Sequence, residues 1–127
     1  MKLHAASSAP DTDWAVRLVD VHPDGFAVDV SRGIVRARYR ESYEAPSFLT
    51  PGRVYEYTMK MTPTSNLFLA GHRLRLDISS SDFPNYDRNH NTGRDYWEDS
   101  AFVTARQTVF HDGPRPTRVT LPVVPRG

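Results

Sequence analysis

The sequence predicts an all-β protein, a β-sandwich or a jelly roll. Several segments have strand-like patterns separated by turn residues, and only 63–70 and 94–101, both short, have any helical character. The clearest pattern lies within 71–81, where apolar residues alternate with charged ones, as in a half-buried strand. On one face of this segment lie His72, Leu74, Leu76 and Ile78, and on the other Arg73, Arg75 and Asp77.

The remaining elements are predicted from the pattern of apolar residues and from turn-forming residues between them. Residues 14–22 carry large apolar side chains on both faces, as expected for a strand covered on both sides, and Pro23-Asp24-Gly25 turns the chain into its hairpin partner. Ser31-Arg32-Gly33 interrupts the pattern, and 41–52, with two prolines, is expected to be a loop. The expected strands are 1–6, 14–22, 26–30, 34–40, 54–61, 71–81, 102–110 and 119–124.

Composition excludes several classes of function. The 127 residues, 39% hydrophobic, suit one domain with its own core, and a net charge of +1 gives no electrostatic footprint for nucleic acid. The absence of cysteine excludes disulfides and thiolate chemistry. No apolar run approaches the roughly 18 residues that span a membrane. The first ten residues lack the apolar region of a signal peptide, which favours a cytoplasmic location.

The first expected strand begins almost at residue 1, with no turn or cap before it. A domain of this class usually has further strands upstream. We therefore expect an N-terminally truncated β-domain, a fragment or late domain of a longer protein.

Catalytic motifs are absent from the sequence. The five histidines are scattered without an HExxH pattern, no GxSxG elbow occurs, and Ser79-Ser80-Ser81 ends a strand with no helix to follow. We therefore expect no catalytic residue and no cofactor, and we expect His72 to be a satisfied edge residue of its strand. The other histidines are His4, His22, His90 and His111.

The polar stretch after 71–81 resembles a calcium loop in its spacing. Asp87, Asn89, Asn91 and Glu98 fall at positions 1, 3, 5 and 12 of such a loop. Thr92, however, stands where the loop requires glycine, and the flanks are not amphipathic helices. A structural loop rich in Asx turns is the favoured interpretation, with no metal.

Two groups of side chains could contact a partner. The alternating Arg36, Arg38 and Arg40 could bind an anion, although a solvated or ion-paired strand face is more typical of this pattern. The aromatic residues around the polar loop could stack on a sugar, cover the end of the sandwich or dock on another domain. They are Tyr86, Tyr96, Trp97 and Phe102.

Several segments together resemble the C-terminal domain of the CocE/NonD hydrolases, the relatives of X-Pro dipeptidyl-peptidases, cocaine esterase and α-amino-acid ester hydrolases. The resemblance covers nearly the entire chain, in the right order. Its most specific parts are PTSN, GHRLRLDISSSDFP and DRNxNTG, and it also includes SSAPDTDWAVRLVDVHPDG, GIVRARYRES and the closing strand pair.

The resemblance implies a galactose-binding-like jelly roll, appended to an α/β-hydrolase domain that carries the Ser-Asp-His triad. None of that triad maps onto this chain. The loop 82–93 is then the best candidate for contact with the catalytic domain. Its candidate contact residues are Asp82, Phe83, Asn85, Tyr86, Asp87, Arg88, Asn89 and Asn91.

Two hypotheses of different class follow. In the first, the chain is a non-catalytic accessory domain of a serine hydrolase, its partner is the catalytic domain of the parent chain, and exposed strand edges could make homo-oligomers. In the second, it is a free-standing carbohydrate-binding module. The second requires Tyr86, Tyr96 and Trp97 to be exposed and roughly coplanar.

Overall fold

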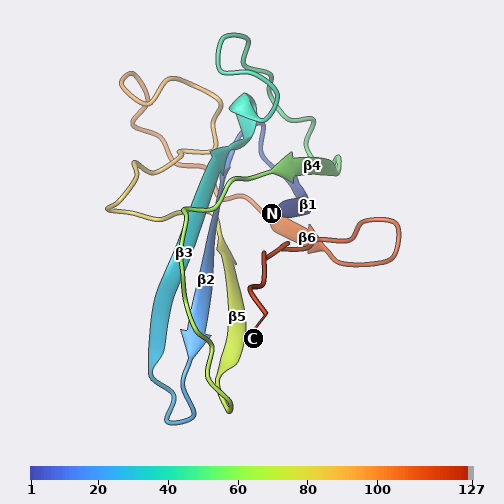
Figure 1. The fold of residues 1–127 in the computed structure, drawn as a ribbon. Helices are drawn as coiled ribbons and strands as arrows, with labels where there is room; N and C mark the ends of the chain where they lie inside the picture. Colours follow the sequence, from blue (N-terminus) through green and yellow to red (C-terminus); the bar gives the residue numbers. More distant parts are fainter. Residues whose placement is uncertain (126–127) are drawn as a thin grey trace.

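The structure, a computed structural model, describes residues 1–125 and consists of six strands, one short helix and long connecting loops (Figure 1). The elements are β1 Lys2–Ser7, β2 Asp13–Val21, β3 Ala27–Arg36, a 3-10 helix Ala37–Tyr39, β4 Tyr55–Thr58, β5 Arg73–Ser79 and β6 Gln107–Phe110.

The strands form two three-stranded sheets in which every pairing is antiparallel. One sheet has the order β4-β1-β6 and the other β3-β2-β5. In Figure 1 the second sheet forms a long blade, and the smaller sheet lies against it near the end where β2 begins. The predicted all-β sandwich is therefore confirmed.

The core lies where β1 and β4 face the beginning of β2. Leu3, Trp14, Val16 and Tyr57 are each at most 1% exposed, and the Trp14 and Tyr57 rings lie 5.9 Å apart between centroids. All of β2 except Arg17 is buried, which confirms the prediction of a strand covered on both sides.

The predicted break at 31–33 is wrong, as the β2–β3 hairpin shows. Residues 26–30 and 34–40 were expected as separate strands, but β3 runs through the break, and a bulge opposite Leu18 and Val19 absorbs the irregularity. Gly33 sits inside the strand because a Cβ there would come within 2.9 Å of the Lys60 carbonyl oxygen. Beyond Arg36 the chain turns into the 3-10 helix instead of continuing as a strand.

Other segments contain less regular structure than predicted. Within residues 1–125, neither 63–70 nor 94–101 is helical, and no helix is long and apolar enough to cross a bilayer. The segment 119–124 forms no strand, and the chain pairs with β1 there only through a single bridge between Lys2 and Arg118. The predicted strands 54–61 and 102–110 shorten to β4 and β6, because their partner β1 is only six residues long.

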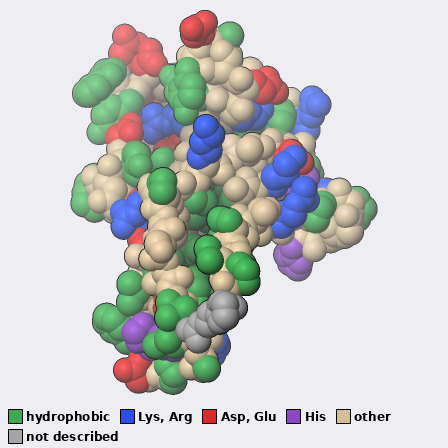
Figure 2. All heavy atoms as spheres, viewed as in Figure 1, with side chains coloured by type: hydrophobic (Ala, Val, Ile, Leu, Met, Phe, Trp, Pro, Cys, Tyr) green, Lys and Arg blue, Asp and Glu red, His purple; other side chains and the backbone are tan. Residues whose placement is uncertain are grey.

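The apolar residues of β5 lie on one face, as predicted, but only some of them are buried. Leu76 and Ile78 pack against the core, whereas Leu74, on the same face, is 57% exposed. Leu74 pairs with Asp20, beyond the part of β2 that contributes to the core. Hydrophobic side chains are visible on the surface at this end of the molecule (Figure 2).

Candidate functional site

The candidate site is the long loop between β5 and β6, residues 80–106, together with the side chains that anchor it at one end of the sandwich (Figure 1). Polar turn residues dominate this stretch, so its backbone groups need partners outside a regular ladder. Those partners come from β2, β3 and the segment between β1 and β2.

Asp82 anchors the start of the loop on the sheet. Its buried carboxylate pairs with Arg17 of β2, and Arg32 of β3 lies 3.7 Å away. Its main-chain oxygen accepts hydrogen bonds from the amides of Asn85 (2.9 Å) and Tyr86 (3.3 Å). This places a tight turn directly on the exit from β5.

Two buried carboxylates, Asp11 just before β2 and Asp13 at its first residue, form ion pairs with two arginines of the predicted stripe. Arg36 makes a bidentate contact with Asp13 through Nε (2.8 Å) and Nη2 (3.0 Å). Arg38 donates its Nε (2.7 Å) and its backbone amide (2.9 Å) to Asp11, a completely buried residue. The ion-paired interpretation of the stripe is therefore correct for these two arginines, which lie in a partly buried network and not on a solvated face.

Arg36 also contacts the loop. Its Nη2 lies 3.1 Å from Asp87, and the hydrogen bond with Asp13, joined by the charge of Asp87, raises the pKa of the guanidinium above its usual value. The charged guanidinium ties the loop to β3 through Asp87.

Asn89 connects the loop to both carboxylates. Its Nδ2 donates to Asp11 (2.8 Å) and Asp13 (2.9 Å), and its Oδ1 accepts from the backbone amide of Asn91 (2.9 Å). The last bond is the Asx turn expected from the sequence, and it accompanies a left-handed backbone at Asn91 (φ 64°).

These contacts account for the calcium-like spacing in another way. Asp87 faces an arginine, Asn89 directs its amide nitrogen at two carboxylates, and Glu98 is exposed. The loop thus makes the ion pairs and the Asx turn that a hydrogen-bonded structural loop requires.

The second half of the loop closes on Asp99. This carboxylate accepts the Thr92 hydroxyl and the Ala101 amide (3.0 Å), and these two bonds lower its pKa below the usual range. The side chain of Asn91 donates to the Val103 carbonyl (2.8 Å), and the Val103 amide donates to the His90 carbonyl (3.0 Å). The loop is therefore cross-linked along its length.

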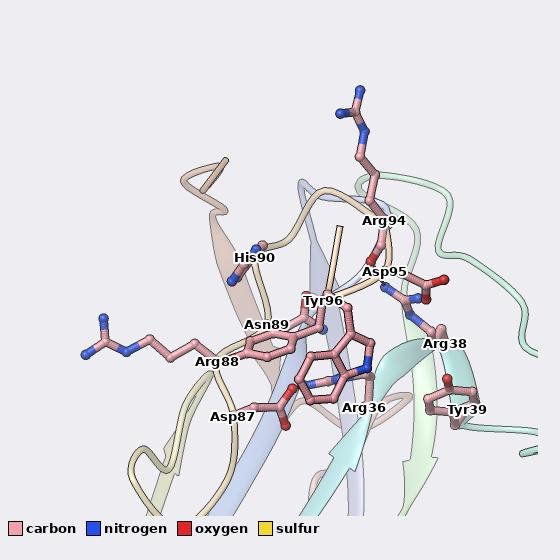
Figure 3. Close-up of a pocket in the computed structure, with 11 residues that line it drawn as sticks. Arg36, Arg38, Tyr39, Asp87, Arg88, Asn89, His90, Arg94, Asp95 and Tyr96 are labelled. Atoms are coloured by element: carbon pink, nitrogen blue, oxygen red, sulfur yellow. Dashed lines mark hydrogen bonds and ion pairs between the residues drawn. The ribbon is translucent and has the colours of Figure 1, made fainter. Parts of the chain in front are cut away.

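A cleft of about 170 Å³ opens between this loop and β3 (Figure 3). Arginines and polar side chains dominate its lining, and in Figure 3 Arg36, Arg38 and Tyr39 come from β3 and its 3-10 extension, with Asp87 to His90 coming from the loop. The full lining is Arg36, Arg38, Tyr39, Asp87, Arg88, Asn89, His90, Arg94, Asp95, Tyr96 and Trp97.

Aromatic side chains surround the cleft and remain open to solvent. Trp97 is 91% exposed, Tyr96 and Phe102 are also exposed, and both Tyr96 and Phe102 contact the His90 ring. The planes of Tyr96 and Trp97 meet at 81°. The two rings therefore do not form the coplanar platform that the sugar-binding hypothesis requires.

The eight loop residues chosen from the sequence are brought to one end of the molecule, with Asp87, Arg88 and Asn89 lining the cleft itself. Asp11 and Asp13 were not among the predicted site residues, which all came from the loop 82–93. Two acids beside a strand that precedes an arginine stripe were a usable signal for this pairing.

The serines at the end of β5 and His72 before it make polar contacts with neighbouring groups. Ser79 Oγ donates to the Ser81 carbonyl (2.7 Å), and the Phe83 amide donates to Ser81 Oγ (3.3 Å). His72 Nδ1 lies 2.8 Å from Asp20, so the ring is satisfied at the start of β5.

Fold and site together define a helix-poor β-sandwich with a rigid polar loop, ringed by exposed aromatics, at one end. The family model described as the X-Pro dipeptidyl-peptidase C-terminal non-catalytic domain matches residues 1–120. The chain belongs to this family, and it is a C-terminal domain of the CocE/NonD type.

Curated relatives agree with this assignment. The chain is 45% identical to cocaine esterase of Rhodococcus sp. (strain MB1 Bresler) over 130 residues, which covers 98% of this chain and 22% of the relative. It is 31% identical to a putative serine esterase of Mycobacterium bovis over 97 residues, which covers 63% of this chain and 15% of the relative.

Two solved structures share the fold. An aminopeptidase from a marine sediment archaeon, Thaumarchaeota archaeon, superposes with a TM-score of 0.85 at 34% identity over 91% of this chain. An α-amino acid ester hydrolase superposes with a TM-score of 0.78 at 33% identity over 90%. The chain spans about a fifth of the length of each of these proteins (21% and 20%) and of the cocaine esterase (22%).

Proposed function

We propose that this chain is the later part of a jelly-roll domain that packs on the α/β-hydrolase domain of a longer serine hydrolase and shapes the surroundings of its active site. The parent enzyme would cleave an acyl ester or an X-Pro peptide bond through an acyl-enzyme. The chain itself supplies no nucleophile. The single observation that carries the proposal is a rigid loop whose aromatic side chains point into solvent.

The rigidity of the loop supports a docking role. Asp82, Asn89 and Asp99 hold its backbone through ion pairs and hydrogen bonds, so little conformational entropy remains to be lost on association. Trp97, at 91% exposure, is the type of residue that anchors protein interfaces.

The open end of the β3-β2-β5 sheet supports the idea of further strands. Leu74 is 57% exposed and Phe26 62%, and β3 and β5 are both edge strands with unpaired ladder groups. Upstream strands of a complete jelly roll would cover this surface. Independently of this surface, a serine-hydrolase parent predicts a GxSxG elbow in the reading frame upstream of Met1.

Activity assays test the non-catalytic assignment. The purified 127-residue chain is expected to hydrolyse neither activated esters nor X-Pro amides, whereas the longer polypeptide hydrolyses one of them. Turnover by the short chain that persists through successive purification steps and resists serine-directed inhibitors would contradict the assignment.

The docking surface is tested in the longer polypeptide with Trp97→Ala. The expected result is faster proteolytic cleavage between the two domains and a lower unfolding temperature, because an interface anchor is lost. The matched control is Tyr43→Ala, since Tyr43 is 83% exposed but lies outside the loop. Equal behaviour of the two variants would argue against docking through this loop.

The carbohydrate-binding alternative has less support. The 81° angle between Tyr96 and Trp97 prevents both rings from stacking on one flat sugar face. Calorimetry against a glycan panel distinguishes the two functions, since saturable heats that disappear in Trp97→Ala would favour the module.

A further inference from the structure

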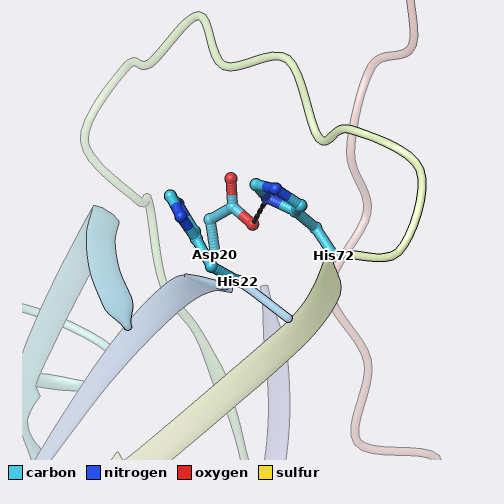
Figure 4. Close-up of side chains that lie close together, drawn as sticks. All are labelled: Asp20, His22 and His72. Atoms are coloured by element: carbon cyan, nitrogen blue, oxygen red, sulfur yellow. Dashed lines mark hydrogen bonds and ion pairs between the residues drawn. The ribbon is translucent and has the colours of Figure 1, made fainter. Parts of the chain in front are cut away.

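A second polar cluster lies at the other end of β2, outside the loop and its cleft. Asp20, His22 and His72 each present a ligand-type atom, and these three atoms lie within 4.8 Å of one another. Figure 4 shows the Asp20 carboxylate between the two imidazole rings, with His72 Nδ1 at 2.8 Å from Asp20 Oδ1. The two imidazole centroids are 4.3 Å apart.

Strand geometry brings the three residues together. Asp20 and His22 are two positions apart along β2 and its exit, so they point to the same face. The register pairs Val21 with Arg73, which sets the neighbouring His22 and His72 opposite each other. The arrangement therefore depends on the ladder and not on a mobile loop.

The surroundings of the Asp20 carboxylate suit a cation ligand. Asp20 is only 5% exposed, and its two carboxylate oxygens are held by separate partners, Oδ1 by His72 Nδ1 (2.8 Å) and Oδ2 by the Asn66 amide (3.3 Å). The Asn66 amide also orients the second carboxylate oxygen, as outer-sphere partners of metal ligands do.

We propose that Asp20, His22 and His72 form a binding site for a divalent transition-metal ion of the zinc class. Two imidazoles and one carboxylate are a donor set that such ions favour, whereas calcium and magnesium prefer oxygen ligands alone. Ligand atoms around tetrahedral zinc lie about 3.3 Å apart, given bond lengths of about 2.0–2.1 Å. A small side-chain adjustment within the 4.8 Å cluster reaches this spacing.

Binding replaces the hydrogen bond between His72 Nδ1 and Asp20. The ring proton on Nδ1 moves to Nε2 by exchange with solvent, which frees the Nδ1 lone pair for the ion, and water completes the coordination shell. The ion would join the end of β2 to the start of β5, where Leu74 is exposed and the apolar core gives little support.

Calorimetric titration of the 127-residue chain with Zn²⁺ tests the proposal. We expect one ion per chain and a rise in the unfolding temperature with Zn²⁺ concentration. His22→Asn should weaken binding at least about 100-fold, because a direct ligand matters at least as much as an outer-sphere partner. In residues 1–125 the His22 ring has aromatic contacts with Phe26 and His72 but no side-chain hydrogen bond, so this variant keeps the fold.

The matched control is the exposed His111→Asn, which should bind Zn²⁺ like the unsubstituted chain. Imidazole NMR signals of His22 and His72, but not of His111, are expected to shift on titration. Absence of saturable binding, or binding that His22→Asn leaves unchanged, would overturn the proposal.

Discussion

The two ends of the β3-β2-β5 sheet differ although they belong to the same strands. Near the start of β2, Trp14 and Val16 are each 1% exposed beneath β1 and β4. Near its end, on the same face, the residue paired with Asp20 is Leu74, which is 57% exposed. One end is a closed core and the other is an open face.

The difference shows that alternation along a strand determines which face a residue occupies, but not whether that face is covered. Covering depends on the length of the opposite sheet, and β1 is short. The closed end stabilises the domain through burial, and the open end leaves apolar surface available to further strands or copies of the chain.

The largest expected effect is at the closed end. Trp14→Ala removes the largest fully buried side chain, and we expect a loss of about 3–5 kcal/mol in the free energy of unfolding, measured with urea. Such a loss is a large fraction of the stability of a small domain, so a lower unfolding temperature is expected by circular dichroism. A loss below about 1 kcal/mol would contradict the closed-core description.

The second-largest effect on stability is expected at the ion pair between Asp13 and Arg36, next to the core. Asp13→Asn leaves Arg36 without its bidentate partner, and we expect a loss of about 3 kcal/mol, as for breaking a buried ion pair. The control is Asp77→Asn, whose pairing with Arg75 is solvent-exposed and should contribute little. Equal losses in the two variants would mean that burial of the Asp13 pair is unimportant.

A smaller, pH-dependent effect is expected at Asp99. Because its folded-state pKa is below the unfolded value of about 3.9, its stabilising contribution is present above that pH and is lost as the pH falls through the folded pKa. A carboxyl ¹³C NMR titration should give a midpoint below about 3.9. Thr92→Val removes one hydrogen bond and should raise that midpoint, whereas an unchanged midpoint would exclude the bond as the cause.

The smallest effect on stability is expected at the open end. Leu74→Ser should change the free energy of unfolding by less than about 1 kcal/mol, since the side chain is already mostly solvated. The same substitution should reduce self-association of the 127-residue chain, measured by light scattering. A strictly monomeric chain at high concentration would contradict association through this face.

The sequence predicts strands well where alternation is clear, as in β4 and β5, and where apolar residues occupy both faces, as in β2. It fails at Ser31-Arg32-Gly33, because turn-type residues there are accommodated by a bulge and by the close approach of Lys60, which are tertiary effects. It also fails at 119–124, where apolar alternation exists but the strand partner does not extend far enough.

The candidate site was predicted in part. The Asx-turn character of the loop follows from its Asn and Asp content, and Asn89 and Asn91 confirm it. The pairing of Asp11 and Asp13 with the arginine stripe, and the approach of His22 to His72, depend on contacts between distant segments. The acids near the arginine stripe were a partial signal for the first pairing, whereas no local pattern indicates the approach of His22 to His72.

Amide hydrogen exchange of residues 82–97 tests the central proposal most directly. It should be compared between the 127-residue chain and the longer polypeptide that contains the proposed α/β-hydrolase domain. We expect these residues, and Trp97 in particular, to exchange more slowly in the longer polypeptide, because the catalytic domain covers the loop. Equal exchange in both would contradict docking through this surface.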